Sequence, residues 1–119
     1  MMSGVTSELS RRLVSDQLWD LARPLLPPFA ARPQGGGTAP RDERAVLTAV
    51  VYVLTSDCAW RQLPAMFGVP AATAHRRYAA WTEVHLWRRL DDAAKEAGVD
   101  PSWTATIVAA ADRRASSAT

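Results

Sequence analysis

Residues 58–90 read CAWRQLPAMFGVPAATAHRRYAAWTEVHLWRRL, and they contain the most informative pattern in the chain. It contains two short apolar segments on either side of Gly68, and the second has the periodicity of an amphipathic helix. Ala74, Tyr78 and Trp81 share the apolar side of that helix. A short helix that braces a second helix is typical of a helix-turn-helix, in which the second helix enters a groove of DNA. The pattern therefore predicts DNA binding.

The charge of this stretch favours the same interpretation. Residues 58–90 carry five arginines and one carboxylate, Glu83, whereas the whole chain of 119 residues has a net charge of only +2. The argument therefore depends on the local excess of arginine, which suits bidentate contacts with phosphate and guanine. A GC-rich genome would also favour arginine over lysine, here thirteen to one, and composition leaves both explanations open.

The predicted interface lies on the helix expected over residues 70–81. Opposite its apolar stripe, small residues surround Arg76, which would let the helix approach a groove closely. The alternative is a solvated face with a few charges. Arg88 and Arg89 extend the basic surface, but two aspartates follow them directly, so we assign these arginines no role. The residues predicted to contact DNA are Arg61, Ala72, Thr73, His75, Arg76, Arg77 and Ala80.

Helical patterns also dominate outside this stretch. Ser15 precedes apolar residues at helical spacing, and Gly98 is a stop signal for a later helix. The expected fold class is all-α, a small bundle of four to five helices with a helix-turn-helix. The helical segments are expected at residues 15–25, 42–55, 65–67, 70–81 and 83–97.

The chain divides into three parts by composition. We expect residues 1–13 to be a disordered N-terminus and residues 99–119 to be a disordered tail of small and polar residues. Residues 14–98 would form the helical DNA-binding domain, which contains a linker rich in Pro and Gly over residues 27–40. The tryptophans near the helix-turn-helix, Trp60, Trp81 and Trp87, are expected mainly in the core of this domain, with base stacking as the alternative.

Composition argues against several other classes of protein. A single cysteine, Cys58, excludes an internal disulfide framework and fits a reducing compartment. Two histidines and one cysteine are too few for a usual zinc site, and no phosphate-binding loop or nucleophile elbow occurs. No signal peptide is visible, and the apolar run at residues 45–54 is too short to span a bilayer. We expect a cytoplasmic protein without a cofactor, a bound metal or a membrane partner.

Several motifs resemble the N-terminal helical domain of bacterial insertion-sequence transposases of the IS-five type, over roughly residues 14–103. They are WDLARPLLPP at residues 19–28, the block from CAWRQLP to TAHRRYAAW within residues 58–81, and LWRRL at residues 86–90. The resemblance implies that the partner is double-stranded DNA at the terminal inverted repeats of an element. A second copy of the chain or a catalytic transposase chain would be further partners.

The resemblance also bears on catalysis. In that family the helical domain precedes a DDE catalytic domain of RNase-H-like fold, in which three carboxylates hold two divalent metal ions. In the family, the first catalytic aspartate follows a tryptophan that resembles Trp103. In this chain Ala109 occupies the position of that aspartate, and Asp112 does not align with it. We therefore expect no enzyme. The chain would be the product of a first reading frame, a decayed remnant or a domain fragment.

The expected function is recognition of insertion-element ends in DNA transposition, or binding of those ends as a competitor or helix-turn-helix repressor. The alternative is a protein–protein module, which would dimerise or dock another transposase chain through a Trp-rich surface. In that case Arg76 and Arg77 would merely be solvated.

Overall fold

The computed structural model describes residues 2–27 and 42–117, and within these residues the chain is all-α without strands. The predicted linker at residues 27–40 lies outside the described residues except for Pro27. The described part contains six α-helices rather than the expected four to five. They are α1 (Met2–Leu13), α2 (Asp16–Ala22), α3 (Glu43–Ser56), α4 (Ala71–Glu83), α5 (Leu86–Glu96) and α6 (Ser102–Ser117), together with the 3-10 turns η1 (Arg23–Leu25), η2 (Trp60–Gln62) and η3 (Ala65–Phe67).

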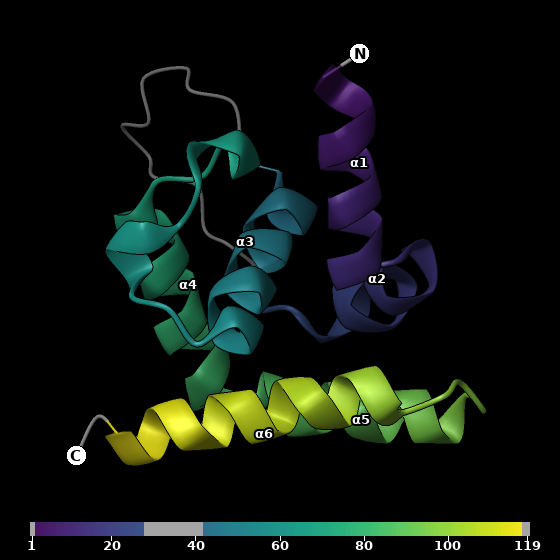
Figure 1. Ribbon diagram of the computed structural model, residues 1–119. Coiled ribbons are helices and arrows are strands. Elements are labelled where there is room, and N and C mark those ends of the chain that lie inside the picture. Colours follow the sequence, from purple (N-terminus) through teal and green to yellow (C-terminus); the bar gives the residue numbers. More distant parts are fainter. Residues whose placement is uncertain (1, 28–41, 118–119) are drawn as a thin grey trace, which may run out of the picture.

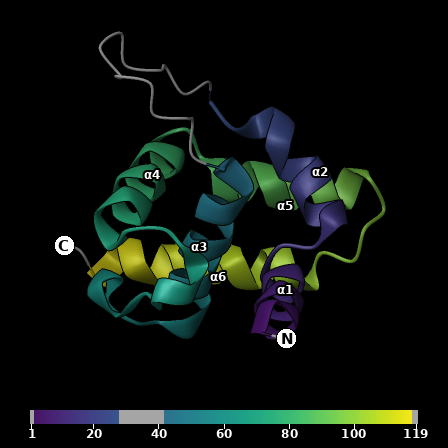
Figure 2. The ribbon, with the colours of Figure 1, turned by 90° about the horizontal axis from the view of Figure 1, so that it is seen from above.

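Helix α3 stands at the centre of the fold (Figure 1). Helix α4 packs on one side of it, while α1 and α2 lie on the other. Helices α5 and α6 form an antiparallel pair across one end of α3, and they lie side by side when seen from above (Figure 2). A helix that is apolar on nearly all sides has to be central in a small domain. The buried residues of α3 are Val46, Leu47, Thr48, Ala49, Val50, Val51, Val53 and Leu54.

The helix ends follow the signals in the sequence. Ser15 caps α2 by accepting a hydrogen bond from the Leu18 amide at 3.1 Å, and Asp42 caps α3 in the same manner. Gly98, the predicted stop, and Gly68, which ends η3, both have a left-handed backbone, with φ of 72° and 70°. The helix expected over residues 83–97 begins only at Leu86, because α4 continues through Glu83.

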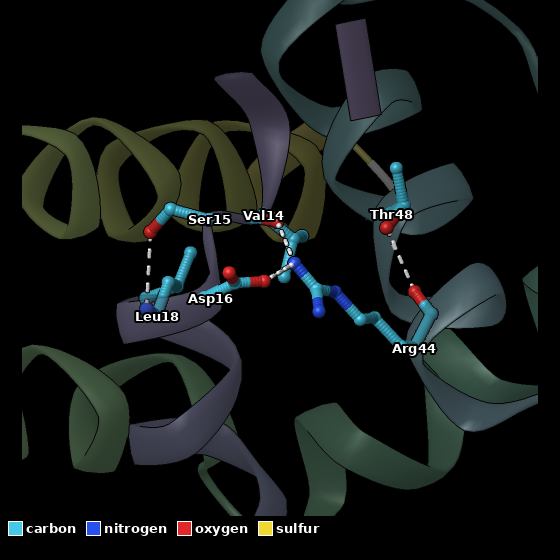
Figure 3. Close-up of polar contacts among 6 residues, drawn as sticks. All are labelled: Val14, Ser15, Asp16, Leu18, Arg44 and Thr48. Atoms are coloured by element: carbon cyan, nitrogen blue, oxygen red, sulfur yellow. Dashed lines mark hydrogen bonds and ion pairs between the residues drawn. The ribbon is translucent and has the colours of Figure 1, made fainter. Parts of the chain in front are cut away.

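A cluster of polar contacts joins the first three helices (Figure 3). The guanidinium of Arg44 at the start of α3 lies 2.7 Å from the carboxylate of Asp16. It also donates to the carbonyl oxygen of Val14 at 3.0 Å, between α1 and α2. One side chain therefore ties the N-terminal pair of helices to the central helix.

The prediction of disordered ends is wrong for the described residues, because α1 and α6 occupy most of both segments. Helix α6 buries Ile107, Ala110 and Ala111 in the core. The indole Nε1 of Trp103 donates to the carbonyl oxygen of Leu13 at 2.8 Å and thereby joins α6 to the end of α1. The small residues of α6 are the reason why the sequence predicted a solvated tail. Alanine, however, is the best helix former and allows close packing between helices.

Candidate nucleic-acid interface

Helix α4, the predicted DNA-contacting helix, is fixed by its inner face. Ala74 and Trp81 are fully buried, and Tyr78 is half-buried beside them. This confirms the apolar stripe predicted from the sequence. Pro70 caps the helix rather than opening it, and α4 runs two residues beyond the predicted end at Trp81. The rigid contact with α3 holds the outer face of α4 in a defined orientation.

The outer face of α4 carries mostly small residues around one arginine, with His75 at its edge and Glu83 at its end. Ala72, His75, Arg76 and Ala80 are exposed, as predicted, and Thr73 is half-buried. Within the helix, the Arg76 guanidinium lies 3.5 Å from the Thr73 hydroxyl, at the limit of a hydrogen bond. The structure therefore brings five predicted residues to one surface, whose only other exposed side chains on α4 are Ala79 and Glu83.

Arg77 is placed differently from the prediction. Its side chain is only 10% exposed and forms an ion pair with Glu43 at the start of α3. A buried and paired guanidinium is poorly placed to contact DNA, so Arg77 belongs to the contact between α3 and α4. Trp81 lies four positions further along the helix, which corresponds to a rotation of only about 40°. The sequence therefore held a signal that Arg77 faces inward, but no signal that Glu43 is its partner.

The turn η2 adds Arg61 to this region. Arg61 is exposed, and the preceding Trp60 packs against α4. The indole centroid of Trp60 lies 5.4 Å from the His75 ring and 5.1 Å from the Tyr78 ring. The side-chain oxygen of Gln62 accepts a hydrogen bond from the Ala59 amide at 2.8 Å and closes the turn. Arg61 is therefore carried by a short turn whose aromatic residue rests on the outer edge of α4.

The element that precedes Gly68 is shorter than the first helix of a helix-turn-helix. Only the three residues of η3 lie there, as a single 3-10 turn. The α-helix that braces α4 is instead α3, which is separated from α4 by residues 57–70. Gly68 and the short turn follow the predicted positions, but the supporting helix is the central one.

Two of the three basic residues on α5, Arg88 and Lys95, are compensated by neighbouring carboxylates. Arg88 lies 3.2 Å from Asp112 on α6, and Lys95 forms an i,i+4 ion pair with Asp91 at 3.1 Å. A hydrogen bond from Thr104 lowers the pKa of Asp91 below its usual value; the Lys95 ammonium acts in the same direction, whereas burial opposes it. The α5–α6 surface is therefore less suited to phosphate than the outer face of α4.

Two further properties concern the described residues alone. No helix in residues 2–27 and 42–117 combines the length and the apolar character needed to cross a membrane. The same residues hold no cluster of three or more His, Cys, Asp or Glu side chains arranged for a metal ion.

Comparison with known families identifies the class of protein. Residues 14–90 match the family described as "Putative transposase of IS4/5 family", and the chain belongs to that family. It is 36% identical over 86 residues to the "Insertion element IS402 uncharacterized 16.2 kDa protein" of Burkholderia cepacia, a match that covers 71% of this chain. The aligned part is 58% of that relative's length. No solved structure matches the chain. The predicted resemblance to insertion-sequence transposases is confirmed.

Proposed function

We propose that the chain binds double-stranded DNA at the ends of an insertion element, through the outer face of α4 and the turn η2. The observation that carries this proposal is the composition of that face. Small side chains surround the exposed Arg76, and the opposite side of the helix packs in the core. An α-helix fits the major groove of B-DNA, and small residues let its backbone approach the base edges.

Each exposed residue would have a distinct role. Arg76 has the planar fork that binds the O6 and N7 atoms of guanine, or a phosphate, in a bidentate manner. Arg61 would bind a phosphate beside the groove, and Thr73 and His75 would contact the backbone or a base edge. Ala72 and Ala80 would provide the close approach rather than polar contacts.

Membership of a transposase family supports DNA as the partner and transposition as the process. We infer that the chain recognises the terminal inverted repeats and does not itself cleave them, and that it acts in the cytoplasm, where the DNA is. On its own it would compete for these ends or repress the element. The competing hypothesis of a Trp-rich docking surface is less well supported, since Trp81 and Trp87 are buried and the other three tryptophans are only partly exposed.

The test is fluorescence anisotropy with a labelled duplex that carries the terminal inverted repeat of the element encoding the chain. We expect Arg76→Ala to weaken binding by about 1–3 kcal/mol. Arg89→Ala, which removes another exposed arginine, from α5, is the matched control and should bind like the wild type. A scrambled duplex of the same composition measures specificity. Equal binding by the Arg76→Ala and wild-type proteins would refute the assignment of the α4 face.

A further inference from the structure

Arg114, in the last turn of α6, reaches the segment that carries Arg61. Its guanidinium donates to the carbonyl oxygen of Cys58 at 2.6 Å, across a sequence separation of 56 residues. A weaker contact of 3.5 Å joins the same nitrogen to the carbonyl oxygen of Val53, in the last turn of α3. Carbonyls at a helix C-terminus lack partners within the helix and attract cations. Arg114 therefore joins the end of α3 to the start of the η2 segment.

The same guanidinium lies over the indole of Trp60, with its central carbon 5.3 Å from the ring centroid. The ring of Trp60 is in turn the one that contacts His75 and Tyr78 on α4. Contacts between a cation and an aromatic face strengthen when the cation is removed from water. The Nε atom of Arg114 is buried and has no hydrogen-bond partner among the described residues, so the side chain is partly desolvated in this position. A continuous set of contacts thus leads from α6 through Trp60 to the outer face of α4.

Helix α6 presents Arg114 from a fixed position. Its inner residues Ile107, Ala110 and Ala111 are buried, and the hydroxyl of Thr104 donates to Asp91 on α5 at 2.7 Å. The C-terminal part of α6 lies beside the segment that joins α3 to α4 in both views (Figures 1 and 2). Helix α6 also lies beyond residues 14–90, the part that matches the family.

We propose that Arg114 is a positioning residue for the DNA interface, and that α6 is a part of the DNA-binding unit rather than an appendage. This inference rests on the proposed function. By holding the Cys58 carbonyl and covering Trp60, Arg114 fixes the backbone that carries Arg61 and supports the ring against which His75 lies. Arg114 itself is not a DNA contact, because its guanidinium is directed to these internal groups.

The experiment compares Arg114→Met with Arg114→Ala and with a control, Arg113→Ala, which removes the neighbouring exposed arginine. Methionine keeps an apolar stem beside Trp60 and removes the charge, so this variant remains folded if the alanine variant does not. We expect Arg114→Met to lose affinity for the inverted-repeat duplex by on the order of tenfold, as Arg61→Ala does. The control should bind like the wild type.

A double-mutant cycle separates positioning from direct contact. If Arg114 acts through the segment that carries Arg61, the double variant Arg61→Ala/Arg114→Met should lose clearly less affinity than the sum of the two single losses. Additive losses would mean that Arg114 acts independently of Arg61, and they would overturn the inference. Wild-type affinity of the folded Arg114→Met protein would overturn it as well, while leaving the proposed function intact if Arg61→Ala still weakens binding.

A second readout does not depend on DNA. Amide hydrogen exchange should show that Arg114→Met loses protection at Gln62 and Leu63, whose amides bond to the carbonyls of Ala59 and Trp60 at 2.9 and 3.0 Å. The Arg113→Ala protein should retain it. Unchanged protection in Arg114→Met would contradict the positioning role even if the wild-type chain proved not to bind DNA.

Discussion

Arg77 and Arg76 are adjacent in the sequence, and the structure predicts opposite consequences for their substitution. The Arg77 side chain is 10% exposed and its partner Glu43 is 30% exposed. Loss of one partner from a fully buried ion pair costs about 3–5 kcal/mol, whereas an exposed pair contributes about 0.2–1 kcal/mol. Because this pair is intermediate in exposure, we expect Arg77→Met to cost about 2 kcal/mol. For a domain of this size, such a loss lowers the Tm by about 8–16 °C.

The assay is urea denaturation followed by circular dichroism, together with DNA binding at a temperature where every variant is folded. Arg77→Met should be less stable than the wild type but bind DNA within about twofold of it. Arg76→Met, the matched control on the outer face, should change stability by less than about 0.5 kcal/mol and weaken DNA binding. The double variant Glu43→Gln/Arg77→Met should lose less free energy of unfolding than the two single variants lose in sum, because the carboxylate that Arg77→Met leaves unpaired is then removed.

An unchanged stability of Arg77→Met, combined with a loss of DNA affinity, would contradict the inward position of Arg77. It would mean that Arg77 faces the DNA, as the sequence alone predicted, and that α4 is rotated relative to α3.

Three further changes test other parts of the account. Trp81 is 1% exposed, so Trp81→Ala should cost about 3–5 kcal/mol in a urea melt, and an unchanged melt would place this residue at the surface. The lowered pKa of Asp91 means that its carboxylate stabilises the fold above its unfolded value near 3.8 and that this contribution is lost as the pH falls through the folded value. The stability lost in Asp91→Asn at pH 6 should therefore shrink as the pH falls below 3.8, whereas a loss independent of pH would contradict the assignment. The purified chain should bind an element end without nicking it in magnesium or manganese, because carboxylates such as Glu43 and Asp112 are engaged by arginines rather than gathered on a shared cation. Cleavage activity that copurifies with the chain and disappears when the metal ions are chelated would contradict this expectation.

Local sequence signals predicted the helices with strong periodicity and clear ends. The cap at Ser15, the stops at Gly68 and Gly98, and the apolar faces of α3 and α4 all follow from short-range rules. These rules depend on residues three or four positions apart, so a single sequence contains them in full.

Contacts between residues far apart in the sequence could not be predicted from these local signals. Helix α6 is rich in Ala, Thr and Ser, and its burial depends on helices that only the folded chain brings close. The pair between Arg77 and Glu43 joins residues 34 positions apart, and the bond from Arg114 to Cys58 spans 56. The candidate site could thus be predicted as a helix face with Arg76 at its centre, whereas the residues that support this face could not.

The proposed contact of α4 and η2 with DNA through Arg76 and Arg61 can be measured as the salt dependence of binding to the inverted-repeat duplex. Each phosphate contact contributes about 0.9 to the slope of log affinity against log salt concentration. We expect Arg61→Ala to lower the magnitude of this slope by about 1. We expect Arg76→Ala to weaken binding to the inverted repeat, and Arg89→Ala to change neither quantity. Slopes and affinities that are the same in the wild type and all three variants would rule out this interface.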